Sequence, residues 1–263
     1  MIKKLFQKTW AQENQLWLDN PPTQKDHLRA MIILTWTAIG LSIVHYWGSP
    51  TFVIAVLKGM NFTEAAKSFN TYMNSGSDAR LHSLCWWAGT IIVVYFVVPA
   101  LLTRFVFKMK LRDMGLKFSG SMDGWPLYVI MLLIMLPLVY YFSSTESFQQ
   151  RYPFYYLVQG ESLWPNFIIW EVVYFFQFVS LEFFFRGFIT LGTRKSFGYM
   201  SIFVMVVPYC MIHFGKPMPE TIGAIVAGIV LGTLSLKSRS VILGILIHYS
   251  VAITMDLMAL WRK

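Results

Sequence analysis

Long blocks of apolar residues alternate with shorter polar stretches along the whole chain. Most of the blocks are about 17–25 residues long, enough for a helix to cross a hydrocarbon core of roughly 30 Å. One soluble core could not bury so many blocks. We therefore predict an all-α fold, a polytopic transmembrane helical bundle of seven to eight spans. The expected spans are 31–48, 83–106, 125–143, 164–190, 197–213, 219–236 and 240–260.

Two segments outside these blocks complete the predicted organisation. The stretch TFVIAVLKGM (51–60) is too short to span and is either re-entrant or interfacial, which leaves the span count open. Residues 1–30 are basic and aromatic and lack the apolar core of a signal peptide, so an interfacial helix is expected there. Accessory spans would then occupy 31–108, and the core of the protein 109–263.

Composition agrees with a membrane environment. The 263 residues are 56% hydrophobic and 13% charged, with a mean hydropathy of +0.53, whereas soluble domains carry about 25% charged residues. The net charge is +9, but Lys and Arg lie mainly between the apolar blocks, where they act as topology signals and contact anionic lipid headgroups. The bilayer is therefore the expected partner, and nucleic acid is not.

The distribution of these cations predicts the orientation. When the polar stretches are assigned to alternating sides of the membrane, one side receives 14 Lys and Arg residues and the other 7. The bias favours a cytoplasmic N-terminus and an external C-terminus. An extra span in 51–60 would reverse every later segment.

Few ionisable side chains fall inside the predicted spans, and each needs a partner, a water-filled cavity or a function because a charge in hydrocarbon costs at least a few kcal/mol. Glu182 and Arg186 lie four residues apart, so they share a helix face and can pair. A pair that only aids packing is one alternative, and a lone membrane histidine usually bonds to a neighbouring helix. However, His213 and His248 lie in two further apolar runs. The other ionisable residues in or beside the spans are Glu171, Glu220 and Asp256.

The segment LEFFFRG (181–187) resembles a motif of membrane peptidases. It matches EExxxR followed by Gly, the first motif of the CPBP family of intramembrane endopeptidases (CAAX protease and bacteriocin-processing, Abi-type). Glu182 takes the place of the second Glu, Arg186 of the Arg and Gly187 of the Gly. Leu181 stands where the family has its first Glu.

Two later segments extend this resemblance, which covers about residues 109–260. YCMIH resembles the second motif, FxxxH, with Tyr209 in place of Phe and His213 as the histidine. His248 matches the histidine of the third motif, HxxxN, although Ala252 replaces the Asn. The resemblance implies an intramembrane endopeptidase that hydrolyses a membrane-associated protein or peptide, in a bacterial inner membrane.

The resemblance also implies roles for these residues. In the family, the first Glu and the second-motif histidine activate water, and the last histidine and Asn stabilise the oxyanion. Because Leu181 replaces that Glu, Glu182 would have to substitute, from about 100° further round the helix. We predict that Glu182 and His213 activate water, that Arg186 holds Glu182, and that His248 donates to the oxyanion.

Two further residues are expected in the substrate cavity. Tyr209 lies one helical turn before the second-motif histidine. Asp256 lies two turns beyond His248 and either enters the same cavity or sits near the far membrane surface.

No cofactor is expected. Glu182 with two histidines could bind zinc, but the HExxH signature is absent and the family resemblance implies a metal-independent mechanism. Cys85 and Cys210, the two cysteines, do not form a CxxC pair, which argues against a disulfide framework or a cysteine metal site.

Two alternatives to a peptidase are open. A catalytically inactive protein of the same fold could serve in binding, immunity or regulation, and Leu181 and Ala252 favour this reading. Buried charges also mark ion pathways, but a transporter lacks support from an inverted repeat or a pair of broken helices.

Overall fold

The computed structural model describes residues 2–156 and 162–262, and their regular structure is entirely helical. The predicted all-α class is confirmed. The α-helices are α1 (Ile2–Asp19), α2 (Gln24–Trp47), α3 (Pro50–Gly59), α4 (Thr63–Asn74), α5 (Ala79–Ile92), α6 (Val98–Leu101), α7 (Trp125–Phe142), α8 (Glu146–Gln149), α9 (Asn166–Glu182), α10 (Gly192–Phe197), α11 (Ser201–Met211), α12 (Met218–Ser238) and α13 (Ile242–Arg262). The π-helical segments are η1 (Val93–Val97), η2 (Leu102–Val106) and η4 (Phe183–Leu191), and the 3₁₀ segments are η3 (Leu111–Met114) and η5 (Gly198–Met200).

Six helical segments in the described part of the chain are long and apolar enough to cross a membrane, so the predicted count of seven to eight is not confirmed. They are Gln24–Trp47, Ala79–Val106, Trp125–Phe142, Asn166–Met211, Met218–Ser238 and Ile242–Arg262.

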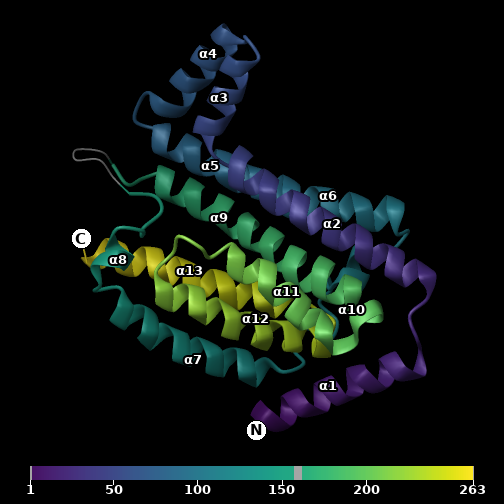
Figure 1. The fold of residues 1–263 in the computed structure, drawn as a ribbon. Helices are drawn as coiled ribbons and strands as arrows, with labels where there is room; N and C mark the ends of the chain where they lie inside the picture. Colours follow the sequence, from purple (N-terminus) through teal and green to yellow (C-terminus); the bar gives the residue numbers. More distant parts are fainter. Residues whose placement is uncertain (1, 157–161, 263) are drawn as a thin grey trace.

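The difference in span count arises in Asn166–Met211, where two spans were expected. Helical structure continues from α9 through η4, α10 and η5 into α11 without an intervening loop. The chain changes direction at Gly198, whose φ of 56° suits glycine, and α11 returns alongside η4 (Figure 1). The reversal therefore lies inside one helical run.

Helix α9 lies in the middle of the bundle (Figure 1). It packs on one side against α5 and on the other against α13, while α11 packs against α12 and α7 lies against α13. The short apolar stretch 51–60 forms α3, which pairs with α4 in a hairpin beyond the bundle and adds no candidate span (Figure 1).

The N-terminal helix α1 is docked on the core. The Trp10 indole N–H donates a hydrogen bond to Thr233 Oγ1 at 3.1 Å, and its ring stacks on Tyr199 at 5.5 Å. Glu13, which is buried, pairs with Arg239. These contacts tie α1 to α12 and to the turn after α10.

An aromatic core surrounds η4. Phe184 and Phe188 are fully buried, and Tyr95 from η1 stacks on Phe184 with ring centroids 4.3 Å apart. A Cβ at Gly187 would collide with the carbonyl oxygen of Met114, so only glycine lets the 3₁₀ segment η3 approach this helix. This packing fixes the segment that follows Glu182.

Candidate active site

Glu182 is the last residue of α9, and its side chain is fully buried. Its Oε1 atom lies 2.8 Å from Nδ1 of His248 on α13 and 3.0 Å from Nη1 of Arg186 in η4. Contacts to two nitrogen groups fix the direction of the carboxylate and neutralise its charge. The structure thus brings three of the predicted site residues together.

The pair of Glu182 and Arg186 lies where α-helix gives way to π-helix. The sequence predicted a continuous α-helix, but residues Phe183–Leu191 adopt π-helical hydrogen bonding, as when the Gly192 backbone N–H donates to the carbonyl of Gly187 five residues earlier. Segments of π-helix are rare and often occur at functional sites. Here the segment keeps Arg186 beside the carboxylate and buries the three intervening phenylalanines.

Gly244 is a site residue that sequence reasoning missed. A Cβ at this position would lie 2.7 Å from Oε2 of Glu182, so glycine is what allows α13 to approach the carboxylate so closely. Oε2 has no hydrogen-bond partner among the described residues. The available signal was spacing, because Gly244 precedes His248 by one helical turn and therefore shares its face.

Arg186 lies over the ring of Tyr209, with 3.9 Å between the guanidinium carbon and the ring centroid. Both side chains are almost completely buried, and this cation–π contact is strong where water is excluded. Tyr209, expected to line the substrate cavity, therefore supports the arginine that holds Glu182.

His213 lies in the turn after α11, on the opposite edge of the site. Its ring packs against Tyr209 at 4.8 Å, whereas the ring of His248 lies 6.3 Å from Tyr209. No hydrogen bond or ion pair joins His213 to Glu182 in the described part of the chain. Water activation by Glu182 and His213 together stays a prediction.

The protonation of His213 follows from its surroundings. Its Nδ1 lies 2.8 Å from the Tyr209 carbonyl oxygen, which can only accept, so Nδ1 carries the proton and Nε2 a lone pair. Burial, with a smaller contribution from Lys216, lowers the pKa of His213 to about 3. The imidazole is therefore neutral at physiological pH.

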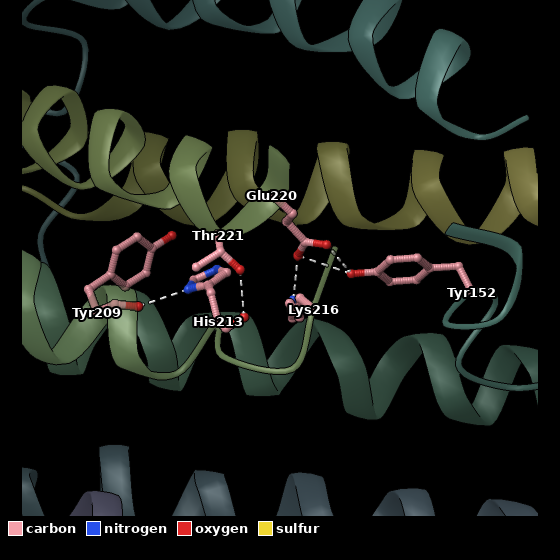
Figure 2. Close-up of polar contacts among 6 residues, drawn as sticks. All are labelled: Tyr152, Tyr209, His213, Lys216, Glu220 and Thr221. Carbon is pink, nitrogen blue, oxygen red and sulfur yellow. Dashed lines mark hydrogen bonds and ion pairs between the residues drawn. The ribbon is translucent and has the colours of Figure 1, made fainter. Parts of the chain in front are cut away.

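A chain of polar contacts holds the turn that carries His213 (Figure 2). Thr221 Oγ1 donates to the His213 carbonyl at 2.9 Å. Glu220 pairs with Lys216 Nζ at 2.6 Å and accepts a hydrogen bond from Tyr152 at 2.8 Å. Burial and the neighbouring Glu220 raise the pKa of Tyr152 well above its ordinary value, so Tyr152 remains a donor. These contacts join the turn to the segment after α8.

His248 is the most accessible of the four predicted catalytic side chains. Its side chain is 19% exposed, whereas those of Glu182 and Arg186 are 0% exposed. Because Nδ1 faces the carboxylate, Nε2 is the nitrogen available to an incoming molecule. The ring also packs against Phe178 at 4.6 Å.

Asp256 belongs to a separate acidic cluster. It is fully buried, and it accepts hydrogen bonds from the Phe154 backbone N–H at 3.3 Å and from Trp170 Nε1 at 3.4 Å. Its carboxyl group also interacts with that of Glu171. The structure places it against α9, away from Glu182.

The two departures from the family motifs occupy apolar surroundings. Leu181 is buried in the aromatic core around Phe184 and Phe185. Ala252 is buried in a second cluster, beside Trp170. Neither position offers a polar side chain to the site.

Glu182, His213 and His248, considered above as an alternative zinc site, do not form a close group of three. Within residues 2–156 and 162–262, no three His, Cys, Asp or Glu side chains gather closely enough to hold a metal ion. Glu182 contacts His248 directly, whereas His213 packs against Tyr209.

Part of the chain that contains this site is similar to a known protein family. Residues 162–254 match the model of the family described as type II CAAX prenyl endopeptidase Rce1-like. No curated protein and no solved structure matches the chain. The matched range runs from just before α9 into α13 and contains the carboxylate and both histidines. The six apolar segments indicate an integral membrane protein, and the match shows that residues 162–254 are similar to this family of endopeptidases. Residues 162–254 form an Rce1-like domain, which is consistent with the CPBP family that the motifs resemble.

Proposed function

We propose that this protein is an intramembrane endopeptidase that hydrolyses a peptide bond of a membrane-associated protein or peptide through Glu182 and His248. The observation that supports this most is the 2.8 Å contact between a fully buried carboxylate and an imidazole that remains accessible. A carboxylate that accepts from Nδ1 selects the tautomer in which Nε2 can take a proton. The Rce1-like match covers both residues.

The reaction begins with a water molecule placed between Nε2 of His248 and the carbonyl carbon of the substrate. Nε2 takes one proton while the water oxygen bonds to that carbon, and the carbonyl π electrons move to its oxygen. When the tetrahedral intermediate collapses, the C–N bond breaks and His248 returns the proton to the leaving amine. The Glu182 carboxylate stabilises the imidazolium formed between these steps.

This assignment differs from the roles expected from the family resemblance. Glu182 and His213 were expected to activate water together, and His248 to donate to the oxyanion. The difference in burial favours His248 as the base, because its side chain is 19% exposed and can meet a water molecule, whereas that of Glu182 is 0% exposed. Arg186 then acts as a positioning residue that holds Glu182.

We further propose that the N-terminus lies in the cytoplasm and that the protein resides in a bacterial inner membrane. The two-to-one distribution of Lys and Arg across the predicted loops supports the orientation. The family resemblance supports the membrane.

The test uses purified full-length protein in liposomes with a set of membrane-anchored fluorogenic peptides. Glu182→Gln and His248→Asn should each lower the cleavage rate at least 100-fold, the lower end of the range for a lost general base. His248→Asn keeps an N–H group near the carboxylate but lacks Nε2. The matched control is Glu64→Gln, which changes an exposed carboxylate on α4. Cleavage that persists in both site variants would contradict the proposal.

The alternative, a catalytically inactive binding protein, is favoured by one observation. Leu181 and Ala252, at positions where the family has polar groups, are packed into apolar clusters. This alternative predicts that the wild-type protein cleaves none of the peptides, and that Glu182→Gln binds them as tightly as the wild type does.

A further inference from the structure

A groove of about 370 Å³ lies between α9 and α13, separate from the Glu182 and His248 pair. Its walls are almost wholly apolar, and a single charged residue, Glu171, is among the residues that line it. The lining residues are Trp164, Phe167, Ile168, Glu171, Val172, Phe175, Tyr249 and Ile253.

Glu171 is buried, but one of its two carboxylate oxygens has no hydrogen-bond partner among the described residues. Its exposed fraction is 7%, and Oε2 accepts a hydrogen bond from the Tyr249 hydroxyl at 3.1 Å. The other oxygen, Oε1, has no hydrogen-bond partner among the described residues. A buried carboxylate oxygen left without a hydrogen-bond donor is costly.

A second carboxyl group adds negative charge behind the first. Asp256 is fully buried, interacts with Glu171, and receives hydrogen bonds from the Phe154 backbone and from Trp170. All the donors to this pair in the described part of the chain are neutral, and no salt bridge reaches either carboxyl group. The two carboxyl groups interact directly and hold one proton between them, so the pair carries one negative charge, which a cation at the groove would balance.

The walls of the groove favour an ammonium ion attached to an apolar chain. Four of the lining residues are aromatic, and aromatic rings bind ammonium groups through cation–π contacts. Edge-to-face contacts brace these rings in pairs, Trp164 with Phe167 at 5.9 Å and Phe175 with Tyr249 at 5.1 Å. A phospholipid fits less well, because no basic side chain lines the groove to receive its phosphate.

We propose that this groove binds a lysine side chain of a membrane-associated peptide, with Glu171 as the counter-ion of its ammonium group. The aliphatic part of a lysine side chain suits apolar walls while its head reaches a charge. If the proposed peptidase function holds, on which this extension rests, the peptide is the substrate. Glu171 precedes Glu182 by eleven residues, about 16 Å along the helix, a distance that an extended peptide covers in about five residues.

The experiment measures binding in the absence of cleavage. Fluorescent membrane peptides carry one lysine at successive positions, and a matched set carries norleucine, which keeps the aliphatic chain but lacks the ammonium group. On the Glu182→Gln background in neutral detergent, the lysine peptides should bind at least 10-fold more tightly at one position. Adding Glu171→Gln should remove this preference and leave the norleucine affinity unchanged, whereas adding Glu64→Gln should preserve it.

Three outcomes would overturn the groove assignment. The first is equal binding of lysine and norleucine peptides at every position. The second is a lysine preference that survives Glu171→Gln in protein whose thermal unfolding is normal. The third is displacement of the lysine peptide by phosphatidylethanolamine but not by an excess of unlabelled lysine peptide, which would make the groove a lipid site. Because no cleavage is measured, Glu171-dependent binding would stand even if the wild-type enzyme proved inactive.

Discussion

The close approach of Gly244 to Glu182 predicts that a single methyl group will disable the site. In Gly244→Ala, the added Cβ would lie 2.7 Å from Oε2, whereas ordinary contacts begin at 3.4 Å. The carboxylate must therefore move by several tenths of an ångström. Its Oε1 atom holds His248 at 2.8 Å, so a shift away from α13 stretches this hydrogen bond beyond useful length.

The expected effect is large on catalysis and small on folding. Displacement of a catalytic group by about 1 Å can cost about 100-fold in rate, and we expect a loss of that order. Alanine favours a helix interior by about 1 kcal/mol relative to glycine. Overpacking costs about 1–3 kcal/mol, so the net destabilisation should not exceed about 2 kcal/mol.

The assay compares peptide cleavage with thermal unfolding of the same preparations. Gly223→Ala on α12 is the matched control, because a Cβ there meets nothing within 4 Å. It should unfold at the same or a higher temperature and cleave normally. A folded Gly244→Ala protein with wild-type cleavage would refute the placement of Glu182 in the reaction.

Two further predictions concern the surroundings of the site. Tyr209→Phe should retain most activity because a phenylalanine ring can still lie beneath Arg186. Tyr209→Leu removes the cation–π contact and should lower both the cleavage rate and the unfolding temperature. Equal effects of the two substitutions would contradict a role for the aromatic ring. His213 has a folded-state pKa of about 3, below the ordinary 6.5, so the folded state disfavours its proton. Its contribution to stability is complete above pH 6.5 and falls by up to about 1.4 kcal/mol for each pH unit between pH 6.5 and pH 3. The unfolding temperature should therefore fall more steeply between pH 7.5 and pH 4.5 for the wild type than for His213→Asn. This variant keeps an N–H donor near Tyr209 but has no group that titrates. Equal pH dependence of the two unfolding temperatures would show that His213 does not cause the loss of stability.

Features that depend on neighbouring residues could be predicted from the sequence. The length of the apolar blocks indicated helices throughout, because the bilayer sets the length of a spanning element. The pairing of Glu182 with Arg186 followed from helical spacing alone. The helical segments and this ion pair both follow from the spacing of residues within one helix, which the sequence shows directly.

Features that depend on packing could not be predicted in this way. The π-helical segment Phe183–Leu191 is embedded among aromatic rings contributed by η1 and α11, and no spacing in the sequence specifies those contacts. The reversal at Gly198 lies within a continuous helical run, so the two spans expected there form one helical segment and the predicted count of seven to eight is not confirmed. Likewise, the four-residue spacing in YCMIH allows Tyr209 to contact His213, but it could not show whether His213 would also reach Glu182 on another helix.

The cost of a charge in hydrocarbon identifies residues that need a partner, but it does not identify the partner. By that criterion Glu171 and Glu182 are equivalent, since both are buried acids on α9. The structure separates them. Glu182 receives an arginine and a histidine, so its charge is matched within the protein and can orient a catalytic imidazole. Glu171 receives only neutral donors in the described part of the chain and lines an apolar groove, which is why we propose that a ligand matches its charge.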